Sequence, residues 1–179
     1  GARVTNPTAG QPEFKGTDQL VCSRKLTPSQ DKRAHIEQMA VLRPQLRKLA
    51  FDREWTVLEF GCDVDRVTAE LLTCGATVIG VETDGNFLGS GTAKLKQTNG
   101  ILIRNENLNE IAPKSCDLSL FVNVFHFLDS DQKRAALEIA LAATRTDGHL
   151  LFIQDHVPDE RAADESFFPL GVRAFQALL

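Results

Sequence analysis

Short apolar segments alternate with amphipathic ones along the chain. The apolar segments span residues 57–60, 76–82, 100–106, 116–125 and 149–155, and they are rich in the β-branched and aromatic side chains that are typical of strands. Because these segments are apolar on both faces, they predict a parallel sheet that helices cover on both sides. The right-handed rule for crossover connections then favours a doubly wound α/β fold.

The segments around the strands carry apolar residues at helical spacing. Helices are expected at residues 28–49, 67–72, 86–96, 130–145 and 164–179. Pro44 is expected to kink or restart the first helix, because proline has no amide hydrogen to donate. In the helix at 130–145, Leu137 and Ala140 belong to the apolar side, whereas Lys133 lies among the polar residues. Residues 147–148, Asp-Gly, are expected to form a turn before the last strand.

The first residues differ in composition from the rest of the chain. Residues 1–19 are rich in Gly, Pro, Thr and Asn and contain few large apolar side chains, which predicts an extended leader. Thr27 is suited to cap the first helix, with Pro28 at its first position. We therefore expect a leader over residues 1–26 and a single domain over residues 27–179.

The overall composition argues against several classes of protein. The 179 residues are 42% hydrophobic and 25% charged, with a net charge of −4, which is ordinary for a globular domain and argues against a general nucleic-acid binder. No apolar run reaches the roughly 18 residues of a membrane span. Cys22, Cys62, Cys74 and Cys116 form no C-x-x-C pair, so we expect no metal site and free thiols in a reducing cytoplasm.

Polar side chains follow the predicted strands. In a doubly wound sheet, ligands bind beyond the carboxyl ends of the strands, where the strand order reverses. Glu82 ends the second strand, about twenty residues after the strand-turn sequence LEFG. An acidic residue at this place can accept hydrogen bonds from ribose hydroxyls, and the alternative is a surface carboxylate near a turn. The spacing favours the ribose role for Glu82.

The motifs VLEFGC, NE, NVFHFL and DGHLLF, with an acid between the first two, occur in an order that resembles class I S-adenosylmethionine-dependent methyltransferases. The resemblance extends over residues 49–156. The sequence GCDVDRVTAEL and residues 121–156 are similar to the phosphoethanolamine N-methyltransferases. This resemblance implies a Rossmann-like methyltransferase fold, S-adenosylmethionine as cofactor and successive methylation of phosphoethanolamine in phosphocholine biosynthesis. Some enzymes of that group carry two methyltransferase domains, one of them vestigial, which implies a second domain as a partner.

The same resemblance implies which residues form the site. Cofactor contacts fall on the loop positions Gly61, Asp63 and Asp65, on Glu82 and Thr83 after the second strand, on Glu106 and Asn107 after the third, and on Asn123 after the fourth. His126 matches the histidine of a Tyr-His catalytic pair.

Asp63 and Asp65 stand where the related loops carry glycine. Glycine allows positive φ and a close approach of the backbone to a ligand, and Asp tolerates left-handed geometry better than most residues. The two carboxylates, however, add volume and negative charge near the carboxylate of the cofactor. Two like charges about 4 Å apart repel by about 1 kcal/mol in water and by several-fold more in a partly buried site. We therefore expect cofactor binding to be weak or lost, unless Arg66 neutralises one carboxylate.

Two further departures concern the catalytic pair and the end of the sheet. The chain contains no tyrosine, so a Tyr-His pair cannot form within it, and we interpret His126 as a pocket-edge or surface histidine rather than a catalytic residue.

Methyltransferases of this class also add two strands after the fifth, and we find neither before Leu179. The fifth strand is therefore expected to present an edge for pairing with another domain or copy.

These observations leave three functions open. The first is a methyltransferase of phosphobase type that acts on a small amine and carries a degenerate cofactor loop. The alternative is a non-catalytic methyltransferase-like domain that scaffolds or regulates an active partner domain. The expected protein partner is a second methyltransferase domain or, in a homo-oligomer, another copy of the chain. A Rossmann-like binder of another nucleotide is ranked last, because the loop lacks the second and third glycines that a pyrophosphate needs.

Overall fold

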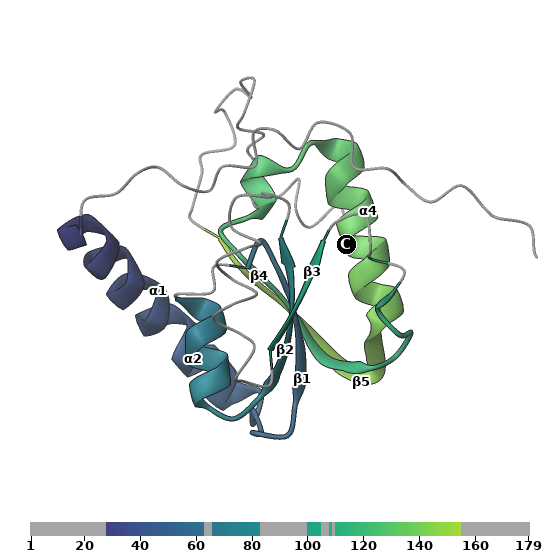
Figure 1. The fold of residues 1–179 in the computed structure, drawn as a ribbon, viewed down its shortest axis with the longest axis horizontal. Helices are drawn as coiled ribbons and strands as arrows, with labels where there is room; N and C mark the ends of the chain where they lie inside the picture. The colour runs from purple at the N-terminus through teal and green to yellow at the C-terminus, as the bar shows by residue number, and fades with distance from the viewer. Residues whose placement is uncertain (1–27, 63–65, 83–99, 105–107, 109, 155–179) are drawn as a thin grey trace, which may run out of the picture.

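Parallel strands form the centre of the molecule (Figure 1). The structure is a computed structural model that describes residues 28–62, 66–82, 100–104, 108 and 110–154. Its strands are β1 (Thr56–Phe60), β2 (Thr77–Glu82), β3 (Gly100–Arg104), β4 (Cys116–Val122) and β5 (Thr144–Ile153). They lie in the order β3-β2-β1-β4-β5, and each neighbouring pair is parallel. The chain therefore winds outward from β1 in one direction and from β4 in the other, which confirms the doubly wound α/β fold.

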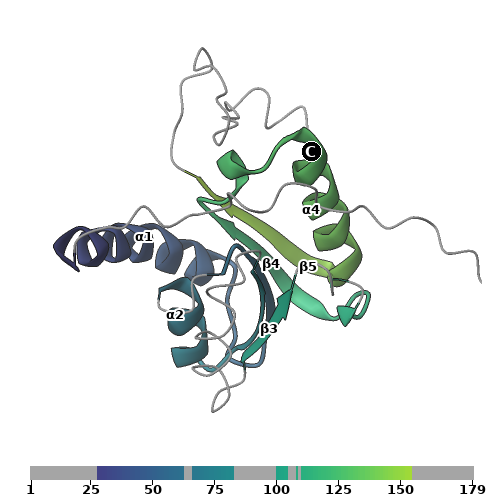
Figure 2. The same cartoon turned by 45° about the horizontal axis from the view of Figure 1, so that its top comes forward.

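Helices cover both faces of the sheet. Helices α1 (Pro28–Lys48) and α2 (Val67–Thr73) lie on one face, and α4 (Ser130–Ala143) lies on the other (Figures 1 and 2). A short 3-10 turn, η3 (Phe125–Phe127), joins β4 to α4. The helices expected at residues 86–96 and 164–179, and the leader expected over residues 1–26, lie outside the described residues.

Each face of the sheet has its own buried cluster, because side chains alternate between the two faces along a strand. The cluster on the side of α4 includes Leu58, Phe60, Phe121, Ala136, Leu137 and Ala140. The cluster on the side of α1 and α2 includes Met39, Leu42, Val57, Leu71, Val78 and Leu118. Burial of these apolar side chains from both sides fixes the positions of the strand ends, from which the loops of the site begin.

Helix α1 runs through Pro44 without a break. Proline cannot donate to the carbonyl four residues earlier, which belongs to Ala40. Ala40 is exposed, so water can satisfy that carbonyl. The expected restart of the helix at Pro44 is therefore wrong.

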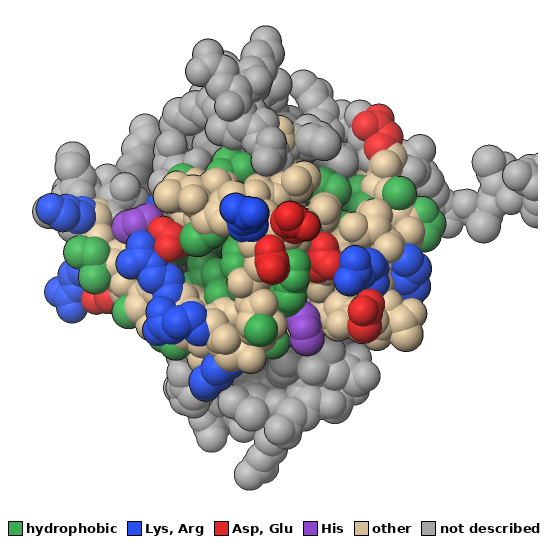
Figure 3. Space-filling view, turned by 90° about the horizontal axis from the view of Figure 1, so that it is seen from below, with side chains coloured by type: hydrophobic (Ala, Val, Ile, Leu, Met, Phe, Trp, Pro, Cys, Tyr) green, Lys and Arg blue, Asp and Glu red, His purple; other side chains and the backbone are tan. Residues whose placement is uncertain are grey.

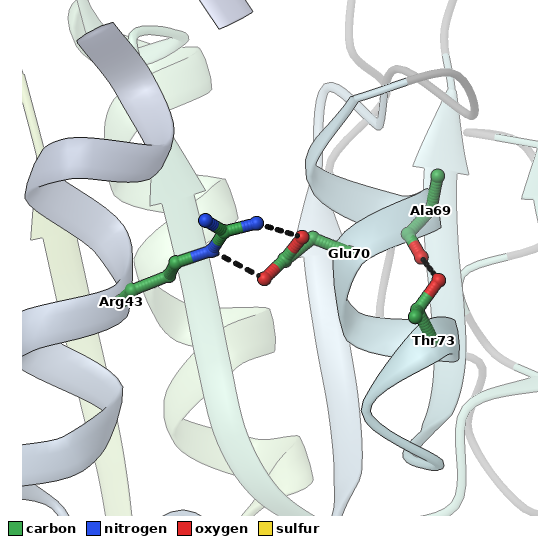
Figure 4. A network of polar contacts seen from close by, with 4 residues as sticks. All are labelled: Arg43, Ala69, Glu70 and Thr73. Carbon is green, nitrogen blue, oxygen red and sulfur yellow. Dashed lines mark hydrogen bonds and ion pairs between the residues drawn. The ribbon is translucent and has the colours of Figure 1, made fainter. Parts of the chain in front are cut away.

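An ion pair joins α1 to α2 (Figure 4). The Nε and Nη2 atoms of Arg43 donate to the two carboxylate oxygens of Glu70 at 2.6 and 2.9 Å. The hydrogen bond from Arg43 lowers the pKa of the Glu70 carboxyl below its ordinary value. Basic side chains gather on the side of the molecule where α1 lies (Figure 3), and the exposed ones on α1 are Lys32, Arg33, Arg43, Arg47 and Lys48.

Two strands differ from the sequence expectation. β4 ends at Val122 rather than at residue 125, because Asn123 has a left-handed φ of 54° that leaves the strand conformation. β5 begins at Thr144 and includes the expected turn at residues 147–148. Cys116 pairs with Thr144 and Leu118 with His149, so four residues of β5 stand opposite one residue of β4. The predicted turn is therefore a wide irregularity within β5.

Candidate functional site

The ends of β1, β2 and β4 lie level with one another at the carboxyl edge of the sheet. Phe60, the last residue of β1, pairs with Val81 of β2 on one side and with Phe121 of β4 on the other. Strand order reverses between β1 and β4, and the loops that follow these two strands diverge to opposite faces of the sheet. This is the place at which doubly wound sheets bind their ligands.

Gly61 begins the loop after β1 in a geometry that only glycine adopts easily. Its φ is +67°, and a Cβ atom at this position would lie 2.6 Å from Cγ2 of Val124 in the loop after β4. The amides of Gly61 and Cys62 both donate to the carbonyl of Val81, at 2.9 and 3.2 Å. The backbone of Gly61 is exposed between the buried residues Phe60 and Cys62. A ligand can therefore approach the main chain of this loop closely.

A buried carboxylate lies beneath the same loop. Glu59 of β1 is 2% exposed, and its Oε2 accepts a hydrogen bond of 2.7 Å from Oγ1 of Thr68, which is fully buried in the first turn of α2. Burying a carboxylate is unfavourable unless hydrogen bonds compensate for the lost water. The hydrogen bond connects the end of β1, before the loop, with the first turn of α2, after it.

Aromatic rings pack on the face of the sheet that α4 covers, close to the carboxyl edge. The rings of Phe60, Phe121 and Phe152 lie side by side on β1, β4 and β5, with centroids 4.5 and 4.7 Å apart and planes within 6° of parallel. Phe125 of η3 packs edge-on against both Phe121 and Phe152, at 5.4 Å. The aromatic layer therefore supports the turn after β4 from below.

Hydrogen bonds fix the segment between β4 and α4 from several directions. The amide of Asn123 donates to the carbonyl of Ile153 at 2.8 Å, and the amide of Phe125 donates to Oε1 of Gln154 at 3.1 Å. Asp129 caps α4 in a capping box with Gln132, in which each side chain accepts from the other residue's amide. Asn123 is thus held at the edge by Ile153 of β5 as well as by its place directly after β4.

Lys133 is a buried charge in the first turn of α4. It is 5% exposed, and its Nζ donates to the carbonyl of Leu128 at 2.6 Å. Burial lowers the pKa of the Lys133 ammonium from 10.5 to about 8, and the nearby carboxylate of Asp129 opposes part of that shift. The expectation that Lys133 belongs to the polar side of the helix is wrong, because the side chain lies beneath the β4–α4 turn.

His126 is also buried, with 3% of its surface exposed. It belongs to η3, two residues before Leu128. The interpretation of His126 as a surface histidine is therefore wrong, since the turn brings the ring inward. A place at the edge of a ligand pocket stays a prediction.

The structure brings together part of the predicted site. Gly61 and Asn123 lie at the carboxyl edge, Val124 contacts the Gly61 position, and Glu82 is the last residue of β2, opposite Arg104 of β3. The side chain of Glu82 lies outside the described part of the chain, and so do Asp63, Asp65, Thr83, Glu106 and Asn107.

Sequence reasoning missed Glu59 and Thr68. A signal was present, because a carboxylate occurs inside the otherwise apolar strand sequence TVLEF and therefore needs a buried partner. Within the residues that the structure describes, no group of three or more His, Cys, Asp or Glu side chains could hold a metal ion. None of the described helices is long and apolar enough to span a membrane.

A family model for the methyltransferase domain matches residues 58–152, more than half of the chain. The match begins inside β1 and ends inside β5, so it covers the sheet edge and both loops described above. The chain therefore belongs to the methyltransferase-domain family. Among curated proteins, none matches the sequence.

Solved structures share the fold. PH0226 from Pyrococcus horikoshii OT3 superposes with a TM-score of 0.66 at 18% identity, covering 84% of this chain and 81% of that one. YcgJ from Bacillus subtilis superposes with a TM-score of 0.65 at 15% identity, covering 80% of this chain and 66% of that one. A third structure is the 1,6-didemethyltoxoflavin-N1-methyltransferase of Burkholderia thailandensis, crystallised with 1,6-didemethyltoxoflavin and S-adenosylhomocysteine. It superposes with a TM-score of 0.52 at 20% identity, covering 68% of this chain and 52% of that one. The fold is that of S-adenosylmethionine-dependent methyltransferases, and this chain spans only 66% and 52% of the last two.

Proposed function

We propose that the chain is a methyltransferase domain that binds S-adenosylmethionine at the carboxyl edge between β1 and β4. The observation that carries this proposal is Gly61, whose exposed backbone at φ +67° lies against Val124 at the point where strand order reverses. Membership of the methyltransferase-domain family supports the same site. The residues fit such a cofactor, because Gly61 exposes its backbone at the sheet edge and lets the loop after β4 pack closely beside it, where a Cβ atom would lie 2.6 Å from Cγ2 of Val124.

Residues at this edge have separate roles in the proposal. Gly61 and the two loop carboxylates, Asp63 and Asp65, lie along the amino-acid part of the cofactor, and Glu82 accepts from the ribose hydroxyls. The proposal assigns Glu106 and Asn107 to the adenine and Thr83, which follows Glu82, to the cofactor as well. S-adenosylmethionine supplies a methyl group on a sulfonium that is already a good leaving group. The chain then has to bind and orient the reactants in a site from which water is excluded.

We assign the acceptor side of the proposed site to the turn after β4. Asn123 is held there at φ 54° by its amide bond to Ile153, and buried His126 follows in η3. The proposed acceptor is a small amine of phosphobase type, which rests on the likeness of residues 61–71 and 121–156 to phosphoethanolamine N-methyltransferases. The same likeness supports a second domain or a second copy as partner. A cytoplasmic location is proposed on the thiols of Cys74 and Cys116, which form no disulfide.

Asp63 and Asp65 favour a second candidate function. If their carboxylates repel the cofactor strongly, the domain keeps the fold while an active partner domain performs the transfer. Repulsion of about 1 to several kcal/mol for each carboxylate corresponds to about one to several decades in affinity. The two functions therefore differ by an amount that direct titration resolves.

The test is calorimetric titration of S-adenosylmethionine and of S-adenosylhomocysteine into the protein. Micromolar binding would rule out a non-catalytic domain whose cofactor site has been lost. The absence of heat at millimolar ligand would rule out the catalytic function. Asp63→Gly with Asp65→Gly is expected to raise affinity at least about tenfold. Asp63→Asn with Asp65→Asn removes the charge and keeps the volume, so it separates repulsion from steric hindrance. Unchanged affinity in both double variants would show that the loop carboxylates do not limit binding.

A further inference from the structure

We infer that Thr68 is a positioning residue for the cofactor loop, acting through the buried carboxylate of Glu59. The inference rests on the proposed function, because it concerns the same sheet edge. Thr68 makes its side-chain bond beneath the loop rather than toward the ligand. Its hydroxyl determines how firmly the start of α2 is held against the end of β1.

The geometry places this bond across the base of the loop. Thr68 Oγ1 donates to Glu59 Oε2 over 2.7 Å, and nine residues separate the two along the chain. Glu59 is the fourth residue of β1, and Thr68 is the second residue of α2. One hydrogen bond therefore ties together the two elements between which the Gly61 loop runs.

The carboxylate of Glu59 lies on a central strand, where the neighbouring strands and α2 surround it. β1 lies between β2 and β4, and Glu59 pairs with Gly80 on one side and Leu120 on the other. Glycine on one neighbouring strand leaves room for the carboxylate, whereas leucine on the other offers it no polar atom. Water is nearly excluded from both partners, since Glu59 is 2% exposed and Thr68 is fully buried. A polar group in such a place needs a hydrogen bond to offset the loss of water, and the Thr68 hydroxyl provides one.

The chemistry of threonine suits this role. Its β-branched side chain has few accessible rotamers, so the hydroxyl is aimed in one direction. If position 68 only had to fill apolar space, valine would fit as well, because it has the same shape as threonine but no hydroxyl to donate. The buried carboxylate is therefore the reason that position 68 needs a hydroxyl.

The bond acts at the point where the loop leaves the sheet. Immediately after Glu59 and Phe60, the amides of Gly61 and Cys62 share the carbonyl of Val81 as acceptor. On the other side of the loop, α2 begins at Val67, and the side chain of its N-cap residue, Arg66, makes no capping hydrogen bond. The Glu59–Thr68 bond restrains the first turn of α2 from within the core, so a ligand that contacts the main chain of Gly61 and Cys62 meets groups that are already held in place.

The experiment compares Thr68→Val with Thr68→Ser and with the control Thr73→Val. Thr73 lies on the same helix, but its hydroxyl donates to the carbonyl of Ala69 at the exposed surface (Figure 4). Each protein is titrated with S-adenosylhomocysteine, and its amide hydrogen exchange and thermal unfolding are measured. Thr68→Val is expected to lower affinity by about tenfold or more and to speed exchange at Gly61 and Cys62. Thr68→Ser is expected to restore both properties largely, and Thr73→Val is expected to change neither.

A purely structural role gives a different result. Thr68→Val would then lower the unfolding temperature while affinity and exchange at Gly61 and Cys62 stayed at the wild-type values, which overturns the inference. If the wild-type protein binds no S-adenosylhomocysteine, the proposed function fails, and the exchange rates alone decide the role of Thr68. If Thr68→Val does not fold, the double variant Glu59→Gln with Thr68→Val replaces it and is compared with Glu59→Gln alone, since the amide leaves no unpaired carboxylate and valine removes the hydroxyl. Equal affinity and equal exchange at Gly61 and Cys62 in these two proteins would likewise overturn the inference.

Discussion

The two loops at the carboxyl edge of the sheet are held in different ways. The β1–α2 loop rests on a polar contact between residues close in sequence, the 2.7 Å bond between Glu59 and Thr68. The β4–α4 turn rests on an aromatic layer and on hydrogen bonds from distant segments, including that from Phe125 to Gln154. Both supports are buried, but the polar one is a single hydrogen bond between two residues, whereas the aromatic one joins three strands and η3.

The two supports meet at one contact. Gly61 begins the first loop, Val124 belongs to the second, and a Cβ atom on Gly61 would lie 2.6 Å from Cγ2 of Val124. The aromatic layer also passes beneath both loops, because Phe60 precedes Gly61 and stacks on Phe121 of β4. Changes in the aromatic layer should therefore disturb both loops, and changes in the polar support should disturb only one.

Phe121→Ala is expected to cause the largest loss, because Phe121 is 1% exposed and contacts Phe60, Phe125 and Phe152. Truncation of a buried phenylalanine costs about 3–5 kcal/mol, since it removes apolar burial and leaves a cavity. Denaturation in urea measures the change in the free energy of unfolding. The control is Leu141→Ala on α4, where the side chain is 57% exposed and the expected change is within about 0.5 kcal/mol. Equal losses in the two variants would contradict the role of the aromatic layer.

Gly61→Ala tests the contact between the two loops. The methyl group would meet Val124 at a distance that real side chains do not tolerate, and alanine is strained at φ +67°. Together these effects are expected to cost about 2–3 kcal/mol in the free energy of unfolding.

The double variant Gly61→Ala with Val124→Ala separates the two causes. Removal of the Val124 methyl groups relieves the close contact and leaves the backbone strain, so the loss at Gly61 should be about 1–2 kcal/mol smaller in this background. Strictly additive losses would show that the two loops are not in contact at this point.

The sequence was sufficient for the fold and for part of the edge. Alternating apolar strands and helices predict a sheet covered on both faces, and the position of Gly61 at a strand end follows from that pattern alone. The same pattern extends the fourth strand to residue 125, so it does not place Asn123 at the strand end. The supports beneath the loops were not predictable in the same way. Stacking of Phe60, Phe121 and Phe152 depends on the register between β1, β4 and β5, and many sequences with the same alternation would form other registers.

Lys133 shows the same limit for a single residue. Helical spacing alone places it among polar neighbours, and a lysine in such a position is ordinarily solvated. The turn from Phe125 to Leu128 folds over it instead, and the carbonyl of Leu128 accepts from its Nζ at 2.6 Å. The position of that turn depends on Gln154 and on the aromatic layer, neither of which is local to the helix.

The buried ammonium of Lys133 should make stability depend on pH. Its pKa falls from 10.5 to about 8 in the folded protein, so the unfolded chain binds more protons between these pH values. The free energy of unfolding should therefore rise with pH across this interval, and the unfavourable contribution of Lys133 is complete below about pH 8. Lys133→Met lacks this contribution. The difference in the free energy of unfolding between wild type and Lys133→Met therefore isolates Lys133, because the titration of the other groups is common to both proteins.

Urea denaturation of both proteins at pH 7, 8, 9 and 10 measures the effect. Wild type is expected to gain about 2 kcal/mol relative to Lys133→Met between pH 7 and pH 10. Arg134→Met is the matched control, because Arg134 is the exposed neighbour on α4 and keeps its charge throughout the interval. A constant difference between wild type and Lys133→Met would mean that Lys133 stays charged in the folded protein. The turn over α4 would then hold the ammonium by strong hydrogen bonds, and the β4–α4 support would be as polar as the bond beneath Gly61.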